Sequence, residues 1–157
     1  MNTQTTTDRI VKETVLKAPL SRVWRAISDA AEFGEWFKVD MSGQTFRPGE
    51  PVHAKMTYPG HEGTPFEIVV ARVEPERLFS FRWHPWGVGP DFDHPDDPMT
   101  LIEFELEEVE GGTKLTVTEY GFDNIPLARR GEAFRGNDEG WAMQLTNIEA
   151  YVTSRSS

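Results

Sequence analysis

The chain has 157 residues, the size of one domain, and is long enough to bury roughly 70% of the surface that the unfolded chain would expose. It contains no cysteine, which excludes cysteine-ligated iron–sulfur clusters, thiolate zinc sites and thiol nucleophiles, and we expect no bound cofactor. With 26 acidic against 16 basic side chains, the formal net charge is -10, which opposes binding to nucleic acid or to an anionic membrane surface.

The amino-terminal residues 1–7 are polar and lack the basic start and apolar run of a secretion signal. We therefore expect a disordered tail over residues 1–7, a single domain over residues 8–154 and a cytoplasmic location. No apolar stretch approaches the ~20 residues that a membrane-spanning helix needs, so a membrane is not an expected partner.

The first predicted element is a strand over residues 8–16, in which β-branched residues recur. Ala18 and Pro19 stop this strand and open a helix, because proline suits the first helical turn. The apolar residues that follow are spaced i, i+3, i+4 and i+7, as on one face of a short amphipathic helix. They are Leu20, Val23, Trp24 and Ile27.

A second short helix is predicted immediately afterwards. Asp29 with Glu32 three residues later resembles a capping box, which satisfies backbone donors at a helix start. This helix would contain Phe33, Trp36 and Phe37.

Residues 39–122 alternate with a period of two and are divided by Pro-Gly and Gly-Gly turns, which predicts six strands of an antiparallel meander. The clearest hairpin joins residues 100–109 to residues 113–122 through Glu110-Gly111-Gly112. Its first strand has an apolar face (Ile102, Phe104, Leu106) and an acidic face (Glu103, Glu105, Glu107). In the strand over residues 78–86, an aromatic face (Phe79, Phe81, Trp83) lies opposite Ser80, Arg82 and His84.

The last predicted element is a long helix that begins between residues 127 and 138. Its apolar side would pack on the concave face of the sheet and contains Trp141, Leu145, Ile148 and Val152. Gly140 has no Cβ, and we expect it to let this helix approach the sheet or the two short helices closely.

Several short motifs recur in the order and spacing of one known family. They are Ala18-Pro19 before Val23-Trp24, Trp36 after a second helix, Pro75 before Leu78-Phe79, Gly112-Thr113-Lys114-Leu115 running to Glu119-Tyr120-Gly121-Phe122, and Gly140-Trp141. Over residues 10–152 the chain resembles bacterial homologues of the activator of the heat-shock protein 90 ATPase. That family belongs to the START-like superfamily, also called SRPBCC or birch-pollen-allergen-like.

The resemblance implies an α+β helix-grip fold: one strand, two short helices, six further antiparallel strands, and a long carboxy-terminal helix held by a curved seven-stranded sheet over an internal apolar cavity. It covers only the helix-grip domain of a eukaryotic activator and not its chaperone-binding domain. Because the superfamily includes lipid carriers, hormone receptors, polyketide cyclases and co-chaperones, the resemblance leaves the activity open.

Glu119 is the principal polar candidate. Strand alternation places it on the same face as Leu115 and Val117, where an unpaired carboxylate would be costly. In the functional interpretation Glu119 orients a ligand or acts as a general base. In the structural interpretation it lies at the wet rim of the sheet or pairs with an arginine.

The remaining candidate ligand-binding residues are apolar and could line a pocket or simply fill the core. They are Trp36, Phe37, Phe81, Trp83, Phe122, Trp141 and Leu145. The long segment 84–98 contains four prolines, four aspartates and two histidines, and is predicted to be an acidic lid over the cavity mouth. The alternative, a calcium loop, lacks the required glycine and closing glutamate.

No other catalytic motif is present in the sequence. The four histidines (His53, His61, His84, His94) show no metal-ligand spacing, no Gly-x-Ser-x-Gly elbow occurs, and no glycine-rich segment opens a helix as a phosphate cradle would.

Three functions remain open at this point. The first is binding of a small hydrophobic or amphipathic molecule between the sheet and the last helix. The second, implied by the family resemblance, is a co-chaperone-type module with a protein partner, whose interface could include Glu103, Glu105 and Glu107. The third is a cyclase-like or hydrolase-like enzyme that uses Glu119 as acid and base, with Tyr120 or His84.

Overall fold

The computed structural model describes residues 9–41, 43–57, 59–60, 62–83, 99–124 and 127–154. The order of elements is the predicted one, with six strands after the two short helices. The elements are β1 (Arg9–Leu16), α1 (Leu20–Ser28), α2 (Ala30–Phe37), β2 (Val39–Asp40), β3 (Pro51–Met56), β4 (Pro65–Glu74), β5 (Leu78–Trp83), β6 (Thr100–Val109), β7 (Gly112–Tyr120), the 3-10 turn η1 (Phe122–Asn124) and α3 (Leu127–Ser154). The predicted tail over residues 1–7 lies outside the described residues.

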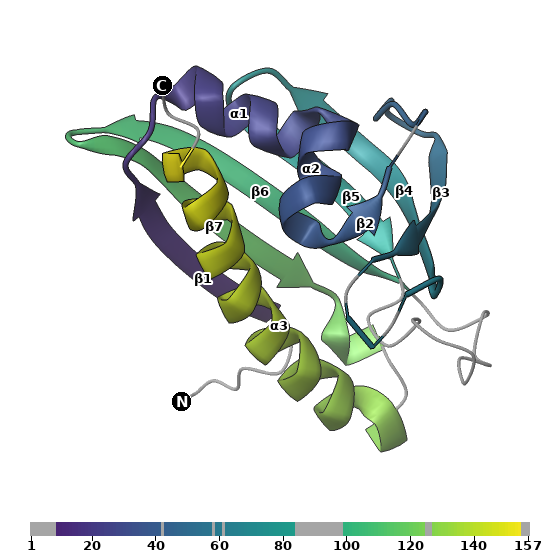
Figure 1. The fold of residues 1–157 in the computed structure, drawn as a ribbon. Coiled ribbons are helices and arrows are strands. Elements are labelled where there is room, and N and C mark those ends of the chain that lie inside the picture. Colours follow the sequence, from purple (N-terminus) through teal and green to yellow (C-terminus); the bar gives the residue numbers. More distant parts are fainter. Residues whose placement is uncertain are drawn as a thin grey trace, which may run out of the picture.

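The strands form one antiparallel seven-stranded sheet in the order β1-β7-β6-β5-β4-β3-β2. The sheet is curved, and α1, α2 and α3 lie over the same face of it (Figure 1). This arrangement confirms the predicted α+β helix-grip fold. No helix among the described residues is long and apolar enough to span a membrane.

Helix α1 begins after Pro19, whose φ of -63° already suits a helix. Val23 and Ile27 are fully buried, as their spacing predicts, whereas Leu20 and Trp24 are only half-buried. The buried face is rotated toward Ala26 and Arg22. The buried arginine was not predicted, because hydrophobic spacing alone does not register a charged residue that has a buried partner.

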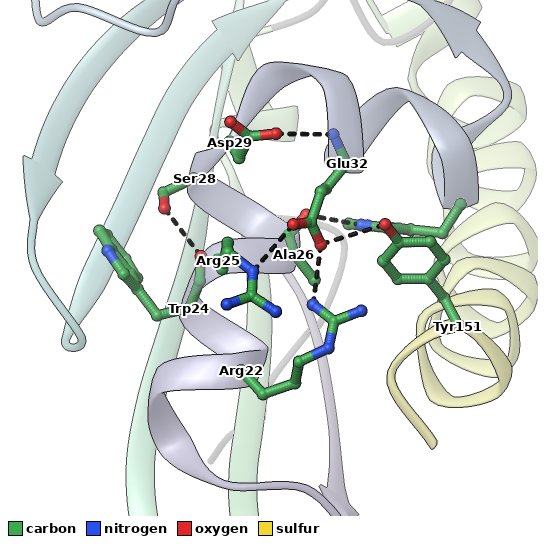
Figure 2. Close-up of polar contacts among 9 residues, drawn as sticks. Arg22, Trp24, Arg25, Ala26, Ser28, Asp29, Glu32 and Tyr151 are labelled. Carbon is green, nitrogen blue, oxygen red and sulfur yellow. Dashed lines mark hydrogen bonds and ion pairs between the residues drawn. The ribbon is translucent and has the colours of Figure 1, made fainter. Parts of the chain in front are cut away.

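Helix α2 begins at the predicted cap, since the Asp29 carboxylate accepts a hydrogen bond of 3.0 Å from the backbone N–H of Glu32. The second half of the capping box does not form. The Asp29 N–H donates to the Arg25 carbonyl, and the Glu32 side chain points toward two arginines instead (Figure 2). Asp29 is the single residue between the two helices and caps both of them.

The β6–β7 hairpin has the predicted register, with Ile102, Phe104 and Leu106 buried on the inner face. On the outer face Glu105 and Glu107 are exposed. The inner face is aromatic, as predicted, and Phe33 of α2 lies at its centre. Its ring is within 6.4 Å, centroid to centroid, of six other rings, those of Trp36, Phe37, Phe46, Phe79, Phe81 and Phe104.

Helix α3 buries Trp141, Ile148 and Val152 as predicted, with Leu145 half-buried. The prediction of a close approach at Gly140 is wrong, since a Cβ built there would meet nothing within 4 Å. The close approach occurs instead at Gly34 of α2, where a Cβ would lie 2.3 Å from the carbonyl oxygen of Val39. Gly140 adjoins Trp141 on the helix, but its own Cα faces away from the packed side.

Candidate functional site

Glu119 lies on the inner face of β7, in phase with Leu115 and Val117, and its exposed fraction is 0%. Of the two structural interpretations from the sequence, the wet rim does not describe this position, and an arginine partner is not found among the described residues. Within the part of the chain that the structure describes, its hydrogen-bond partners are all uncharged side chains. Among the described residues, no charged side chain hydrogen-bonds to this buried carboxylate.

Four side chains donate hydrogen bonds to this carboxylate. Trp141 Nε1 donates to Oε1 over 2.7 Å and Trp83 Nε1 donates to Oε2 over 2.9 Å. Thr100 Oγ1 also donates to Oε2, and Asn137 Nδ2 lies 2.9 Å from one oxygen and 3.0 Å from the other. Each carboxylate oxygen thus has at least two donors, which compensates the desolvation of the group.

Strand pairing and helical spacing explain why these residues meet. Trp83 pairs with Thr100 across β5 and β6, and Glu119 pairs with Ile102 across β6 and β7, so three strand ends meet at one end of the sheet. Asn137 and Trp141 are four residues apart and therefore share one face of α3. The cluster joins this end of the sheet to the first half of α3.

Sequence reasoning missed Thr100 and Asn137. The signal for Asn137 was its position one helical turn before Trp141, and the signal for Thr100 was its place opposite Trp83. Both signals become meaningful only once α3 is known to cross the sheet at this end.

The structure brings five of the predicted aromatic residues into one cluster beside Glu119. The Trp83 and Trp141 indoles stack with centroids 5.6 Å apart, and Phe37 lies 6.1 Å from the first and 6.0 Å from the second. Phe81 contacts Trp83 at 5.4 Å, and Trp36 contacts Phe37 at 5.6 Å. These rings occupy space between the sheet and α3 in which the cavity was expected, so the cavity stays a prediction.

Two predicted site residues lie toward the margins of this cluster. Phe122 is fully buried in η1 and packs against Phe134 of α3, with ring centroids 5.2 Å apart. Leu145 is half-buried and packs on the core one helical turn beyond Trp141. Trp83 is likewise half-buried, so the aromatic cluster reaches the surface at the end of β5.

A second carboxylate contacts the last turn of α3. Glu32 of α2 accepts hydrogen bonds from Arg22 Nη1 at 2.7 Å, Arg25 Nε at 2.9 Å and Tyr151 Oη at 3.0 Å (Figure 2). The Arg22 guanidinium also lies over the Tyr151 ring, 5.0 Å from its centroid. This cluster was not predicted, and it ties α1, α2 and the last turn of α3 together.

Burial and charge act in opposite directions on the pKa values of this pair. Partial burial by itself raises the pKa of Glu32, but the hydrogen bonds from Arg22, Tyr151 and Arg25 and the charge of Arg22 outweigh it, so the pKa is lowered. Burial by itself lowers the pKa of Arg22, and the contacts with Glu32 and Tyr151 raise it above its ordinary value. The lowered pKa of Glu32 and the raised pKa of Arg22 both favour the charged forms of the pair.

The predicted acidic lid over residues 84–98 and its alternative, a calcium loop, lie outside the described residues. The same holds for three of the four histidines, His61, His84 and His94. Among the residues that are described, no three metal-ligating side chains form a group. His53 lies 3.3 Å from a carboxylate oxygen of Glu67 on the exposed side of β3 and β4.

Comparisons with known protein families and solved structures agree with the fold described above. The profile of the family described as Activator of Hsp90 ATPase homolog 1-like protein matches residues 17–153. The chain belongs to this family. The match includes both carboxylate clusters, and no curated protein matches the chain.

Solved structures similar to this family member share its fold. Protein MLL2253 from Mesorhizobium loti has a TM-score of 0.73 at 23% sequence identity, over 95% of this chain and 98% of that one. Protein Ms6760 from Mycobacterium smegmatis has a TM-score of 0.72 at 22% identity, over 92% of this chain and 90% of that one. A protein from Arthrobacter aurescens has a TM-score of 0.74 at 16% identity, over 96% of this chain and 89% of that one.

Proposed function

We propose that this protein binds an apolar or amphipathic small molecule between the sheet and α3, with Glu119 orienting its polar end. The observation that carries the proposal is a fully buried carboxylate, held by uncharged donors, beside the stacked indoles of Trp83 and Trp141. Small-molecule sites are mostly apolar with a few convergent polar groups, and this cluster has that composition. Family membership supports a ligand-binding or co-chaperone-like module in general.

The hydrogen bonds of Glu119 restrict the chemistry of the ligand. Each oxygen already accepts at least two donors, so a ligand group that reaches Glu119 has to replace Asn137 or Thr100 with a donor of its own. A hydroxyl, amide or amine meets this requirement, and a carboxylate does not. The planar part of the ligand would lie against the indole of Trp83, which is half-buried at the end of β5.

The proposal is tested by titrating the isotope-labelled protein with a panel of fatty acids, sterols, flavonoids and aromatic alcohols while backbone amide shifts are followed. We expect saturable shifts centred on Trp83, Glu119 and Trp141 from a ligand with a hydroxyl group, and none from the fatty acids, whose carboxylate has no donor for Glu119. The variant Leu145→Trp adds bulk beside Trp141 and should abolish them while the protein stays folded. Met143→Trp, at an exposed position of the same helix, is the matched control and should bind normally. Affinity retained in Leu145→Trp would contradict this site.

The co-chaperone function rests on the family match and predicts an outer-face interface. Charge reversal is best applied to Glu105 and Glu107, which are exposed, because Glu103 is half-buried and accepts a hydrogen bond from Tyr120. Unchanged capture of a purified chaperone by Glu105→Lys and Glu107→Lys would argue against an interface on β6.

The enzymatic function assigns Glu119 as acid and base. In the structure the proton-accepting positions of both oxygens are occupied by donors, so a general base would first have to lose Asn137. Normal turnover of an identified substrate by Glu119→Gln would eliminate that role.

A further inference from the structure

The outer face of the sheet carries a polar depression that is separate from the Glu119 cluster. The helices α1, α2 and α3 all lie over the opposite face (Figure 1). Strand pairing sets Arg72, Ser80 and Glu103 in one row of the outer face and Val69, Arg82 and Leu101 in the next. These six residues, with Gly49, Val70 and Ala71, line a depression of about 370 Å³.

Ser80 is the unusual residue of this depression. It lies on the outer face of β5, yet its exposed fraction is 0%, and its hydroxyl oxygen has no hydrogen-bond partner among the described residues. A buried hydroxyl normally has one, because the lost hydration is otherwise not compensated. The hydroxyl is therefore a donor for which the described protein supplies no acceptor.

Arg82 supplies the second donor of this depression. It follows Ser80 by two residues on the same face of β5, about 6.6 Å along the strand. No hydrogen bond or ion pair joins its guanidinium to another residue in the described part of the chain, whereas Arg72 pairs with Glu74. A guanidinium and a hydroxyl at this spacing suit one planar oxyanion.

An irregularity in the sheet shapes the depression. The register of β4 against β5 shifts between Val70 and Arg72, which leaves Ala71 as an extra residue of β4. A bulge of this kind bends its strand and re-aims the neighbouring side chains, and such bulges are frequent beside functional sites.

The other residues of the depression narrow the chemistry of the anion. Glu103, whose carboxylate accepts a 3.1 Å hydrogen bond from Tyr120, repels a dianion more strongly than a monoanion. Val69 and Leu101 flank Arg82 on the neighbouring strands and present apolar surface. We propose that this depression binds a carboxylate attached to an apolar group, with Arg82 as the bidentate donor and Ser80 Oγ as the third donor.

The test uses the full-length labelled protein, with benzoate, inorganic phosphate and a peptide of four glutamates as probes at constant ionic strength. Benzoate should give saturable amide shifts at Ala71, Ser80 and Arg82. We expect Arg82→Gln and Ser80→Ala each to weaken binding about tenfold or more, since each removes a hydrogen bond to a charged group. Arg135→Gln, the same change of charge at an exposed position of α3, is the matched control and should bind as the unmodified protein does.

The comparison of probes identifies the source of the carboxylate. Tighter binding of benzoate than of the peptide indicates a small-molecule carboxylate, and the reverse order indicates an acidic side chain of a protein partner. Retention of these shifts in Leu145→Trp separates this site from the one beside Glu119. The proposal is overturned if phosphate binds as tightly as benzoate, if Arg82→Gln leaves the affinity unchanged, or if the shifts are no larger than those at Arg135.

Discussion

At the scale of single residues, Glu119 has the largest predicted effect on stability, because four donors depend on it. Replacing it by glutamine turns one acceptor into a donor that faces other donors. We expect Glu119→Gln to lower the free energy of unfolding by about 3 kcal/mol, measured by urea denaturation. Glu105→Gln, at an exposed position of β6, should leave it unchanged. A loss below about 1 kcal/mol in Glu119→Gln would mean that the hydrogen bonds described here do not hold the carboxylate.

Two buried hydroxyls in the sheet differ in whether the structure gives them a hydrogen-bond partner. Thr113 Oγ1 donates a 2.8 Å hydrogen bond to the Ala18 carbonyl, whereas Ser80 Oγ has no partner in the part of the chain that the structure describes. Thr113→Val should therefore cost about 1 kcal/mol, and Ser80→Ala should leave the protein equally or more stable. Equal losses in the two variants would show that Ser80 has a partner in solution.

At the scale of elements, α3 contains glycines that no packing explains. A Cβ built on Gly136 or Gly140 would meet nothing within 4 Å, so alanine there should only favour the helix. We expect Gly136→Ala and Gly140→Ala each to raise the free energy of unfolding by about 0.5–1 kcal/mol. Gly34→Ala is the opposite case and should be destabilising, because its Cβ would lie 2.3 Å from the Val39 carbonyl oxygen. A loss of stability in Gly140→Ala would indicate that α3 does approach a neighbouring element closely at Gly140, as the sequence predicted.

The stabilisation that Glu32 provides through its contacts with Arg22 and Tyr151 should depend on pH. The pKa of Glu32 is lower in the folded state than its ordinary value of 4.5, so its contribution is fully present above that value and is lost as the pH falls through the folded pKa. In urea denaturation from pH 7 down to pH 3, Glu32→Gln should lose less stability than the unmodified protein, and Tyr151→Phe should be intermediate. An identical pH dependence in Glu32→Gln would contradict the lowered pKa.

The elements themselves were largely predictable, whereas their side-chain networks were not. Caps, turns and alternation depend on neighbours in the sequence, and they predicted α2 from Asp29 and the β6–β7 hairpin from its glycines. The role of Arg22 depends on how the three helices pack together, and that of Asn137 on which strand end α3 crosses, so both roles became visible only in the fold. Gly140 was misread for the same reason, since spacing gives a helix face but not its neighbour.

At the scale of the whole molecule, two carboxylates hold the long helix, one near its middle and one at its last turn. Glu119 joins the first half of α3 to the ends of β5, β6 and β7, and Glu32 joins its last turn to α1 and α2. Between these two hydrogen-bonded clusters the helix packs on the apolar, aromatic face of the sheet. A molecule bound at Glu119 would therefore contact the sheet and the helix together, as a helix-grip ligand site requires.

The most direct test of the central claim follows the indole N–H resonances of three tryptophans during titration with the best ligand of the panel. Trp83 and Trp141 donate to Glu119. Although the Trp36 ring contacts Phe37 of the same cluster, its N–H donates to the Ala26 carbonyl at 2.8 Å and not to Glu119, so its N–H resonance serves as the internal reference. The account predicts saturable shifts of the first two resonances at one common dissociation constant, with Trp36 shifting little. Binding that moves Trp36 and leaves Trp83 and Trp141 in place would contradict a ligand site at Glu119.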